Sequence, residues 1–319
     1  MLTARLQPIA GPLVSPRADA DPEARGLLLG FVGVVIFALT LPMTRLAVGD
    51  ASAPQLPPAF VTAGRAALAG LLSLLWLWHA GARRPARHHW LPLGLCALGT
   101  VVGFPLGIAL ALRDVEAMHA AVITGVLPLA TAVAAALALR QRASTGFWLC
   151  GVIGCALVLA FAAVQGSGRL SAADGWLLLA VASAAIGYVG GARVSADLPG
   201  EQTVCWVLVL SLPLTLPATL LAWPVQPASA SAWGGFLYVS LFSMWLGFFA
   251  WYRGLTLGGV MRVSQIQLLQ PFLALLFAVP ILGERLDAVT VGFALAVVAV
   301  VFVGRRMPAD LGTTRDARR

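Results

Sequence analysis

The chain alternates between long apolar stretches and short polar connections. Ten stretches are apolar over about 20 residues each, the length at which a helix crosses the hydrocarbon core of a bilayer. They cover residues 27–47, 57–79, 90–112, 118–139, 146–165, 175–193, 202–223, 233–254, 261–282 and 288–304. The connections hold most of the charged residues and leave no room for a folded soluble domain. The pattern predicts an all-α membrane protein with ten transmembrane helices.

The composition agrees with this class. Apolar residues make up 60% of the 319 residues and charged residues only 11%, whereas soluble domains carry roughly 25% charge. All 21 basic residues are Arg, and the formal net charge is +8. These Arg residues lie between the apolar stretches, so their expected partner is the surface of the lipid bilayer and not a nucleic acid.

The Arg distribution predicts the orientation. If the amino terminus is cytoplasmic, 16 Arg residues fall inside and four fall outside, the asymmetry expected of cytoplasmic loops. We therefore expect a multi-pass protein of the inner or plasma membrane with both termini cytoplasmic. Residues 1–26 read as a disordered cytoplasmic tail, since they lack a continuous apolar core, and residues 305–319 read as a second cytoplasmic tail.

Two segments of the chain resemble each other. Residues 118–142 read MHAAVITGVLPLATAVAAALALRQR, and residues 261–285 read MRVSQIQLLQPFLALLFAVPILGER. Aligning Pro128 with Pro271 divides the ten spans into two sets of five, residues 27–165 and 175–304. A repeat with an odd number of spans must insert its second copy upside down, so we expect two inverted five-helix repeats. That architecture is typical of transporters, whose substrate path lies between the halves.

The chain resembles the EamA branch of the drug/metabolite transporter (DMT) superfamily. The residues that carry the resemblance are the two segments just quoted, GRAALAG at 64–70, and WYRGLTLGGVMRVSQ at 251–265. The resemblance implies a ten-helix fold with a central cavity lined by spans one, three, four, six, eight and nine. Members of the family move amino acids, related metabolites, sugars or phosphorylated compounds, often outward. The chain departs from the family pattern at Gln141, which stands where the second repeat has Glu284.

Polar residues near prolines are the first candidates for substrate binding. Gln267 and Gln270 share a helical face with Ser264, and Pro271 removes a backbone hydrogen bond about one turn earlier. Side-chain amides in hydrocarbon need partners, so these residues either bind substrate or hydrogen-bond neighbouring helices. Thr124 beside Pro128 and Thr40 beside Pro42 are the corresponding candidates in spans four and one. We expect helix breaks at all three prolines.

Aromatic residues are the second group of candidates. Trp245, Phe249 and Tyr252 share a face of span eight, and Tyr188 is a lone phenol at mid-depth of span six. An aromatic cavity wall would suit apolar or aromatic substrates, whereas anchoring at the lipid interface explains aromatic residues equally well. Both interpretations stay open for Trp245, Tyr252 and Tyr188.

Charged residues within the spans are scarce. Arg65 lies inside span two, where a charge is costly and needs a partner. The family commonly has Arg at this place, which we take to be peripheral, so a structural bond is favoured over contact with a substrate carboxylate. None of the 13 acids lies mid-span, which favours exchange or facilitated diffusion over strict proton antiport.

No enzymatic chemistry is expected. The four Cys residues show no metal-ligand spacing. Within the spans no His, Asp and Glu residues are expected to converge, since the adjacent His88 and His89 lie in a basic loop, so we predict no metal, no cofactor and no catalytic residues.

The sequence therefore predicts a carrier, expected to act as a monomer, that moves a small organic solute by alternating access. The favoured substrates, on the family resemblance, are amino acids or related metabolites, moved by export or exchange. The alternatives are import of a sugar or nucleotide-sugar type solute, and a membrane adaptor or sensor that transports nothing.

Overall fold

The polypeptide folds into a bundle of helices. The computed structural model describes residues 22–138, 142–165, 170–259, 263, 266–307 and 309–310. Among these residues, eight helices are long and apolar enough to cross a membrane, and two shorter apolar helices cover Gln267–Leu282 and Ala288–Gly304. Each of the ten predicted segments is thus helical over most of its described length, while ten membrane crossings remain a prediction.

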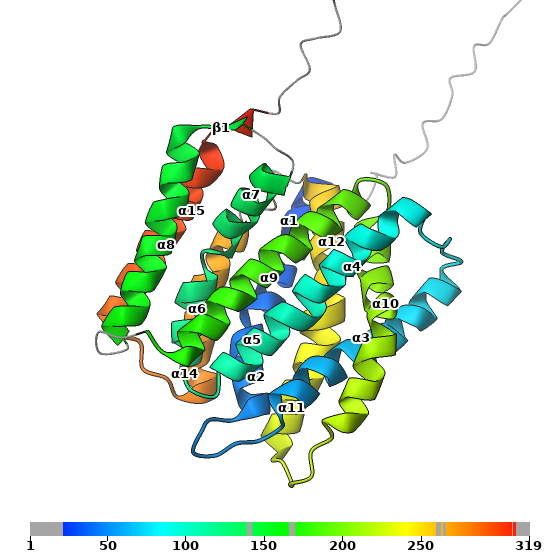
Figure 1. Ribbon diagram of the computed structural model, residues 1–319, viewed down its shortest axis with the longest axis horizontal. Coiled ribbons are helices and arrows are strands. Elements are labelled where there is room, and N and C mark those ends of the chain that lie inside the picture. Colours follow the sequence, from blue (N-terminus) through cyan, green and yellow to red (C-terminus); the bar gives the residue numbers. More distant parts are fainter. Residues whose placement is uncertain are drawn as a thin grey trace, which may run out of the picture.

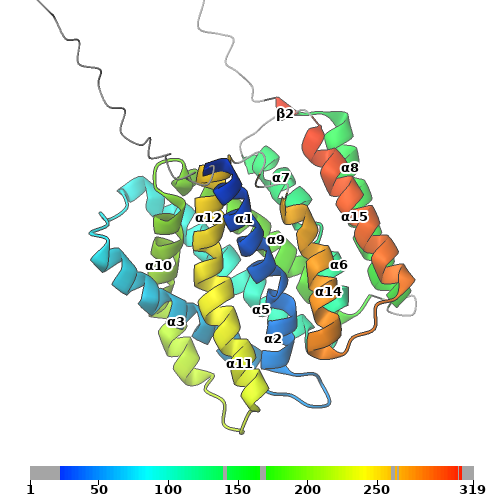
Figure 2. The same ribbon diagram turned by 180° about the vertical axis from the view of Figure 1, so that it is seen from behind.

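Several predicted spans are divided into consecutive helical elements (Figures 1 and 2). In chain order the elements are α1 (Pro22–Ala38), α2 (Thr40–Val48), α3 (Pro58–His79), η1 (Arg87–His89), α4 (Trp90–Cys96), η2 (Ala97–Gly103), α5 (Phe104–Ala111), α6 (Ala117–Thr124), α7 (Leu127–Ala138), β1 (Arg142–Ala143), α8 (Thr145–Gln165), α9 (Ala172–Ser195), α10 (Gly200–Leu221), α11 (Ala230–Tyr238), η3 (Val239–Leu246), α12 (Gly247–Gly258), η4 (Gln267–Leu269), α14 (Gln270–Leu282), α15 (Ala288–Arg306) and β2 (Ala309–Asp310). The strands β1 and β2 form one short antiparallel pair.

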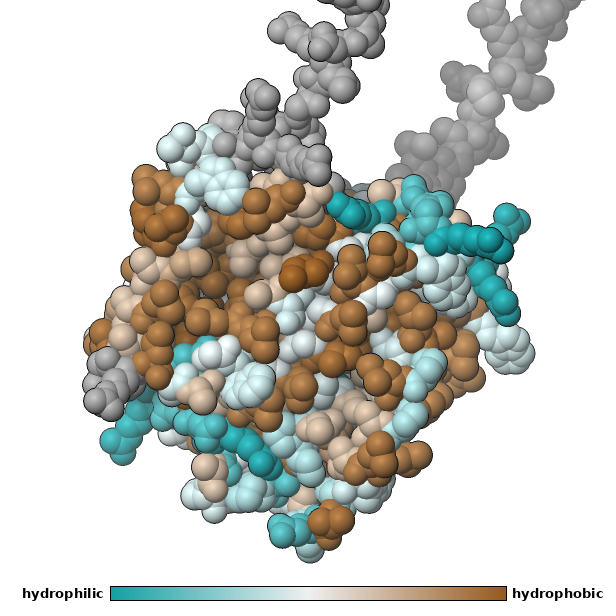
Figure 3. All heavy atoms as spheres, in the orientation of Figure 1, coloured by the Kyte–Doolittle hydropathy of each residue, from teal (hydrophilic) through white to brown (hydrophobic). Residues whose placement is uncertain are grey.

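The outer surface of the bundle is apolar. Large side chains such as Leu75, Leu98, Leu149 and Val152 are more than half exposed. Apolar residues cover the middle of the face in Figure 3, and hydrophilic residues gather toward its two ends. Contiguous exposed apolar surface of this extent is unfavourable in water and is stable against lipid.

The described ends of the chain lie at the same end of the bundle (Figure 2). The first helix begins at Pro22, earlier than the predicted residue 27, because Pro is preorganised for the first turn of a helix and Glu23 suits its positive dipole end. The predicted amino-terminal tail therefore loses residues 22–26 to α1, and its remaining residues lie outside the described part of the chain. The last helix runs to Arg306, two residues into the predicted carboxyl-terminal tail.

Glycines bring α1 and α12 into close contact along the bundle. Gly26 and Gly30 on α1 face Gly254 and Gly258 on α12, so each helix presents two glycines four residues apart. A Cβ atom on Gly254 would lie 2.6 Å from the backbone nitrogen of Gly30. Backbones packed this closely gain dispersion contacts that larger side chains would prevent, which is how small residues hold helices together in lipid.

A second close contact joins η2 to α9. A Cβ atom on Gly187 would lie 2.9 Å from Cγ2 of Thr100 and 3.0 Å from its backbone nitrogen, and a Cβ on Gly103 would lie 2.6 Å from Cβ of Ser183. Like the α1–α12 contact, it joins an element of the first predicted repeat to an element of the second.

Spans three and eight share an unusual construction. Each consists of an α-helix, a π-helical segment and a second α-helix: α4, η2 and α5 in span three, and α11, η3 and α12 in span eight. The two spans run in opposite directions through the bundle (Figure 1). Opposite directions are what an inverted pair of repeats requires.

Contacts between the predicted halves close the end of the bundle away from Pro22. The carboxylate of Glu284 accepts hydrogen bonds from the backbone nitrogens of Ala117 (2.6 Å) and Met118 (2.8 Å) at the start of α6. Burial is the main influence on Glu284 and raises its pKa, although these two hydrogen bonds oppose the shift. Nearby, Nε2 of His119 lies 2.6 Å from Oδ1 of Asp174, which is almost fully buried.

The glycine contact between α1 and α12 can be tested with one matched pair of substitutions. Gly254→Ala places a methyl group against Gly30, so we expect a loss of about 1–3 kcal/mol of stability, the usual cost of overpacking. Gly292→Ala makes the same chemical change in α15, where a Cβ meets nothing within 4 Å, so it should be neutral or slightly stabilising. Thermal unfolding of the two purified variants measures the difference, and equal melting temperatures would contradict the interpretation.

Candidate functional site

A cavity of about 690 Å³ lies between the helices of the two predicted halves. Ligand pockets typically measure about 300–1,000 Å³, so this one fits a small organic molecule. Its walls come from α1, α2, α3, α4, η2, α5, α6, α7, α9, α10, η3, α12, η4 and α14. The two glycine-mediated contacts, α1 with α12 and η2 with α9, each join walls of this cavity.

The cavity extends toward the end of the bundle where α9 and α12 end. Ser195, Ala196 and Gly200 line it there, beside the connection between α9 and α10. At the opposite end the bundle is closed by a buried hydrophobic cluster that includes Leu56, Leu112 and Met118. The structure therefore presents a cavity that is accessible from one end of the bundle.

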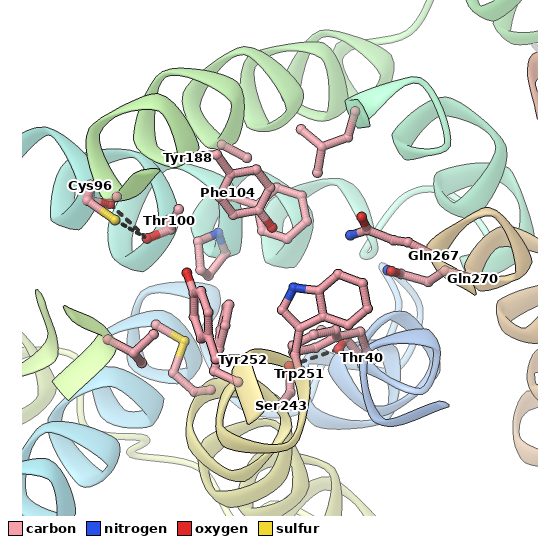
Figure 4. Close-up of a pocket in the computed structure, with 18 of the residues that line it drawn as sticks. Thr40, Cys96, Thr100, Phe104, Tyr188, Ser243, Trp251, Tyr252, Gln267 and Gln270 are labelled. Atoms are coloured by element: carbon pink, nitrogen blue, oxygen red, sulfur yellow. Dashed lines mark hydrogen bonds between the residues drawn. The ribbon is translucent and has the colours of Figure 1, made fainter. Parts of the chain in front are cut away.

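Two glutamine amides point into the cavity. Gln267 lies in the 3₁₀ segment η4, and Gln270 begins α14. Pro271 follows at once, and because it has no backbone N–H it cannot donate to the carbonyl of Gln267 one turn earlier. Both amides face the indole of Trp251 across the cavity (Figure 4). Ser264, their predicted neighbour on the same face, lies outside the described residues.

The other two prolines also follow helix breaks. Span four is interrupted between Thr124, where α6 ends, and Leu127, where α7 begins, just before Pro128. Span one is interrupted at Leu39, three residues before Pro42. Pro128 lines the cavity, whereas Pro42 is buried behind it. Irregular backbone at this depth is tolerated where it borders a cavity.

Thr124 lines the cavity and also bonds to its own helix. Its hydroxyl donates to the carbonyl of Ala120 at 2.7 Å. The oxygen keeps lone pairs that can accept a further hydrogen bond, so this local bond does not remove Thr124 from the polar lining.

A hydrogen-bonded chain connects three helices at the cavity wall. The hydroxyls of Thr40 and Ser243 lie 2.8 Å apart, and Nη2 of Arg65 donates to the hydroxyl of Ser243 at 3.1 Å. Arg65 is only 4% exposed, and its Nε has no hydrogen-bond partner. Arg65 makes the structural bond that was expected of it, but it is not peripheral, because α3 packs against η3 and brings the guanidinium to the cavity.

Aromatic side chains form much of the remaining wall. Tyr188 from α9 and Tyr252 from α12 approach the cavity from opposite sides, with Trp251 beside them (Figure 4). Phe248 lies one turn before Tyr252, with the two ring centroids 6.3 Å apart. Broad ring faces with few polar atoms can stack on a planar solute or attract a cation.

Trp245, one of the substrate-binding candidates from sequence, does not line this cavity. On α12 the residues that line the cavity are Phe248, Trp251, Tyr252, Leu255 and Thr256. Trp245 belongs to the π-helical η3 and packs on Phe249 at 5.1 Å, which in turn packs on Trp76 of α3 at 5.2 Å. A regular α-helical wheel cannot reproduce the facing of residues across a π-helical segment.

The electrostatic character of the cavity is simple. Among the described lining residues, Arg65 is the one charged side chain, and no carboxylate is present. Arg65 forms no salt bridge with a described carboxylate. The buried pair of His119 and Asp174 lies outside the lining. A guanidinium without a protein counter-ion leaves room for a negatively charged group on a ligand.

Several lining residues escaped the sequence prediction, among them Thr100 and Ser243. The sequence did hold a signal for both: the alignment that joins Pro128 to Pro271 also joins Thr100 to Ser243. Both belong to the π-helical segments, η2 and η3, and both line the cavity. No comparable pattern pointed to Phe248 and Trp251, because span eight contains many aromatic residues and nothing distinguishes these two from the others.

Comparison with known proteins assigns the family. The chain matches the EamA-like transporter family over residues 24–163 and again over residues 171–305. This chain belongs to the EamA-like transporter family. Together with its apolar helices, this membership makes it a multi-pass membrane transporter of the drug/metabolite transporter type, and it points away from an enzyme.

Individual relatives agree with the family. The chain is 43% identical over 291 residues to the uncharacterized transporter YdeK of Bacillus subtilis (strain 168), covering 90% of this chain and 99% of the relative. It is 28% identical over 265 residues to the chloroplastic WAT1-related protein At3g02690 of Arabidopsis thaliana, covering 78% of this chain and 63% of that protein. A solved crystal structure, described only as that of a protein, shares the fold of this EamA-like chain with a TM-score of 0.58 and 18% identity, over 88% of this chain and 98% of the other.

The hydrogen-bonded chain at the cavity wall predicts unequal costs for two neighbouring serines. Ser243→Ala leaves the buried Nη2 of Arg65 without its partner, so we expect a loss of about 1.5–3 kcal/mol, as for a bond to a charged group. Ser240→Ala removes an equally buried hydroxyl that donates to its own helix at Phe236, so it should cost about 1 kcal/mol. Thermal unfolding compares the variants, and equal losses would show that the bond to Arg65 contributes nothing.

Proposed function

We propose that this transporter carries amino acids or closely related small metabolites by alternating access, as an exporter or exchanger of the cell membrane. The observation that carries the proposal is the cavity itself. It pairs one cation that forms no salt bridge with a described carboxylate with neutral amides, hydroxyls and an aromatic wall. This combination suits a zwitterionic solute, which carries a negative and a positive group on one small molecule.

The chemistry of each end of such a solute matches a group on the wall. Arg65 lines the cavity, and its Nη2 donates one hydrogen bond, to Ser243, so the part of the guanidinium that faces the cavity can donate to a carboxylate. The amide oxygens of Gln267 and Gln270 can accept from an ammonium group, and the rings of Trp251 and Tyr252 can attract it through their faces. The remaining aromatic surface suits an apolar side chain.

The packing supports a carrier that alternates between two states. With the predicted cytoplasmic termini, the accessible end of the cavity faces the cytoplasm and the closed end faces outward. Opening the closed end requires the carboxylate of Glu284 to leave the start of α6, because that contact ties the two predicted halves together. A solute bound between the halves is then exposed to the other side.

The absence of carboxylates from the described lining favours exchange or facilitated movement over strict proton coupling. Proton-driven carriers often use an intramembrane acid that exchanges its proton as access alternates. The same lining disfavours sugar phosphates and nucleotide-linked solutes, because one guanidinium offers little compensation for several negative charges.

Counterflow in liposomes tests the proposal directly. Vesicles with the purified protein are loaded with unlabelled amino acids, sugars or nucleotide derivatives, and uptake of the matching labelled tracer is followed without an ion gradient. We expect saturable accumulation of an amino acid, and Gln270→Ala should reduce it at least about tenfold. Gln165→Ala is the matched control, since Gln165 bonds Thr290 outside the cavity and should retain uptake. Accumulation of sugars alone would overturn the substrate class, and no flux of any solute would favour the adaptor alternative.

The role of Arg65 predicts a loss of discrimination. The wild type should take up an amino acid at least about tenfold better than the amine that lacks its carboxylate, because only the acid can bond a guanidinium. Arg65→Met should lower uptake of the amino acid and bring the two rates together, while Arg65→Lys should keep part of the preference. An unchanged preference in folded Arg65→Met would place carboxylate binding elsewhere.

A further inference from the structure

Two histidines and an aspartate meet outside the central cavity. Nε2 of His89 lies 2.8 Å from Oδ2 of Asp197, and Nε2 of His88 lies 3.6 Å from the same oxygen. Among the described residues, this is the group of His, Cys, Asp and Glu side chains close enough to hold a metal ion, with its ligand atoms within 4.8 Å of one another. No sequence motif predicts this group, because Asp197 is 108 residues from His89.

Backbone hydrogen bonds hold these residues in position. His89 ends the short segment η1, where its nitrogen donates to the carbonyl of Ala86 at 3.0 Å. Asp197 lies in the connection between α9 and α10, where its nitrogen donates to the carbonyl of Val194 at 3.1 Å. The two segments approach each other because α4 packs along α9, where Gly190 faces the carbonyl of Pro92.

We propose that His88, His89 and Asp197 form a binding site for a divalent transition-metal ion, with Zn²⁺ as the best fit. Two imidazoles, one carboxylate and a water complete a tetrahedral Zn²⁺ shell. With bonds of about 2.0–2.1 Å, neighbouring ligand atoms in such a shell lie about 3.3 Å apart. The separations of 2.8 Å and 3.6 Å from Oδ2 of Asp197 lie on either side of that value. All three ligand atoms lie within 4.8 Å of one another, so rotation of the exposed side chains of His88 and Asp197 can complete the site.

The three proposed ligands differ in how exposed their side chains are. The side chain of His89 is 7% exposed and fixed by its surroundings, whereas those of His88 and Asp197 are 70% and 58% exposed. The exposed pair can therefore adjust to an ion that arrives from water. The contact with the carboxylate of Asp197 places the ring proton of His89 on Nε2 when no ion is bound. A metal that binds Nε2 displaces this proton, which can move to Nδ1, an atom that has no hydrogen-bond partner.

The nearby positive charges do not prevent binding. Arg83, Arg84 and Arg87 precede the two histidines and are exposed, so their flexible side chains extend into solvent or toward lipid headgroups, where salt screens them. Imidazole ligands are neutral when they bind a metal, and the carboxylate of Asp197 supplies the negative charge.

The position gives the site a structural consequence. Ala196 and Gly200, on either side of Asp197, line the mouth of the central cavity. A bound ion would join the segment before α4 to the connection between α9 and α10, and would hold that edge of the mouth in place. Metal binding itself does not depend on which solute the protein carries.

Cobalt titration of the full-length protein, purified without a histidine tag and stripped with a chelator, tests the site. Co²⁺ replaces Zn²⁺ in such shells, and its visible absorption reports imidazole coordination. We expect one saturable Co²⁺ site per chain, displaced by Zn²⁺ and unaffected by Mg²⁺, which prefers oxygen ligands. Zn²⁺ should also raise the melting temperature, because an ion that binds the folded state stabilises it.

Two variants and one control decide the outcome. His88→Ala alters an exposed side chain and Asp197→Asn keeps its shape, so both should fold, and each should weaken Co²⁺ binding at least about tenfold. His79→Ala removes another exposed histidine, at the end of α3, and should bind like the wild type. Binding that is equal in the wild type, His88→Ala and Asp197→Asn, or absent from the wild type, would overturn the proposal. Because no transport is measured, this result is separate from the test of the carried solute.

Discussion

Close approach of helix backbones is the constraint on which the structure depends. In lipid, apolar side chains gain nothing from leaving water, so helices associate through dispersion and through hydrogen bonds that need short distances. Glycines supply those distances where α1 meets α12 and where η2 meets α9. Each contact joins walls of the cavity and links the two predicted repeats. The same small residues that hold the bundle together thus determine how wide the space between the halves can be.

The cavity is polar where the helices are irregular. Breaks before Pro128 and Pro271 and the π-helical segments η2 and η3 all lie at its wall. An irregular turn frees backbone groups that need polar neighbours, and the neighbouring side chains include Thr100, Ser243 and Gln267. The irregular backbone and the polar side chains therefore stabilise each other. Both are tolerated at membrane depth because they border a cavity and not lipid.

Much of this arrangement could be predicted from sequence, and the exceptions have physical causes. Segment length and hydropathy predicted the helices, and the amides at Gln267 and Gln270 stood out because amides are rare in hydrocarbon. Trp245 was misplaced because a π-helical turn cannot be recognised from a periodic pattern. The position of Arg65 at the cavity wall was missed because it depends on the packing of α3 against η3. The meeting of His89 and Asp197 depends on the contact between α4 and α9, which no local pattern records.

The π-helical segment η3 also bears on how this protein family can diverge. A π-helical stretch is a helix that has accepted an extra residue, and one residue corresponds to a rotation of about 100° in an α-helix. Loss of a single residue between Val239 and Leu246 would let the stretch close as an ordinary helix. Phe248 and Trp251 would then turn relative to the preceding helix, and a different set of rings would face the solute. Insertion or deletion at this place is thus a route to new specificity that needs no substitution of Phe248 or Trp251.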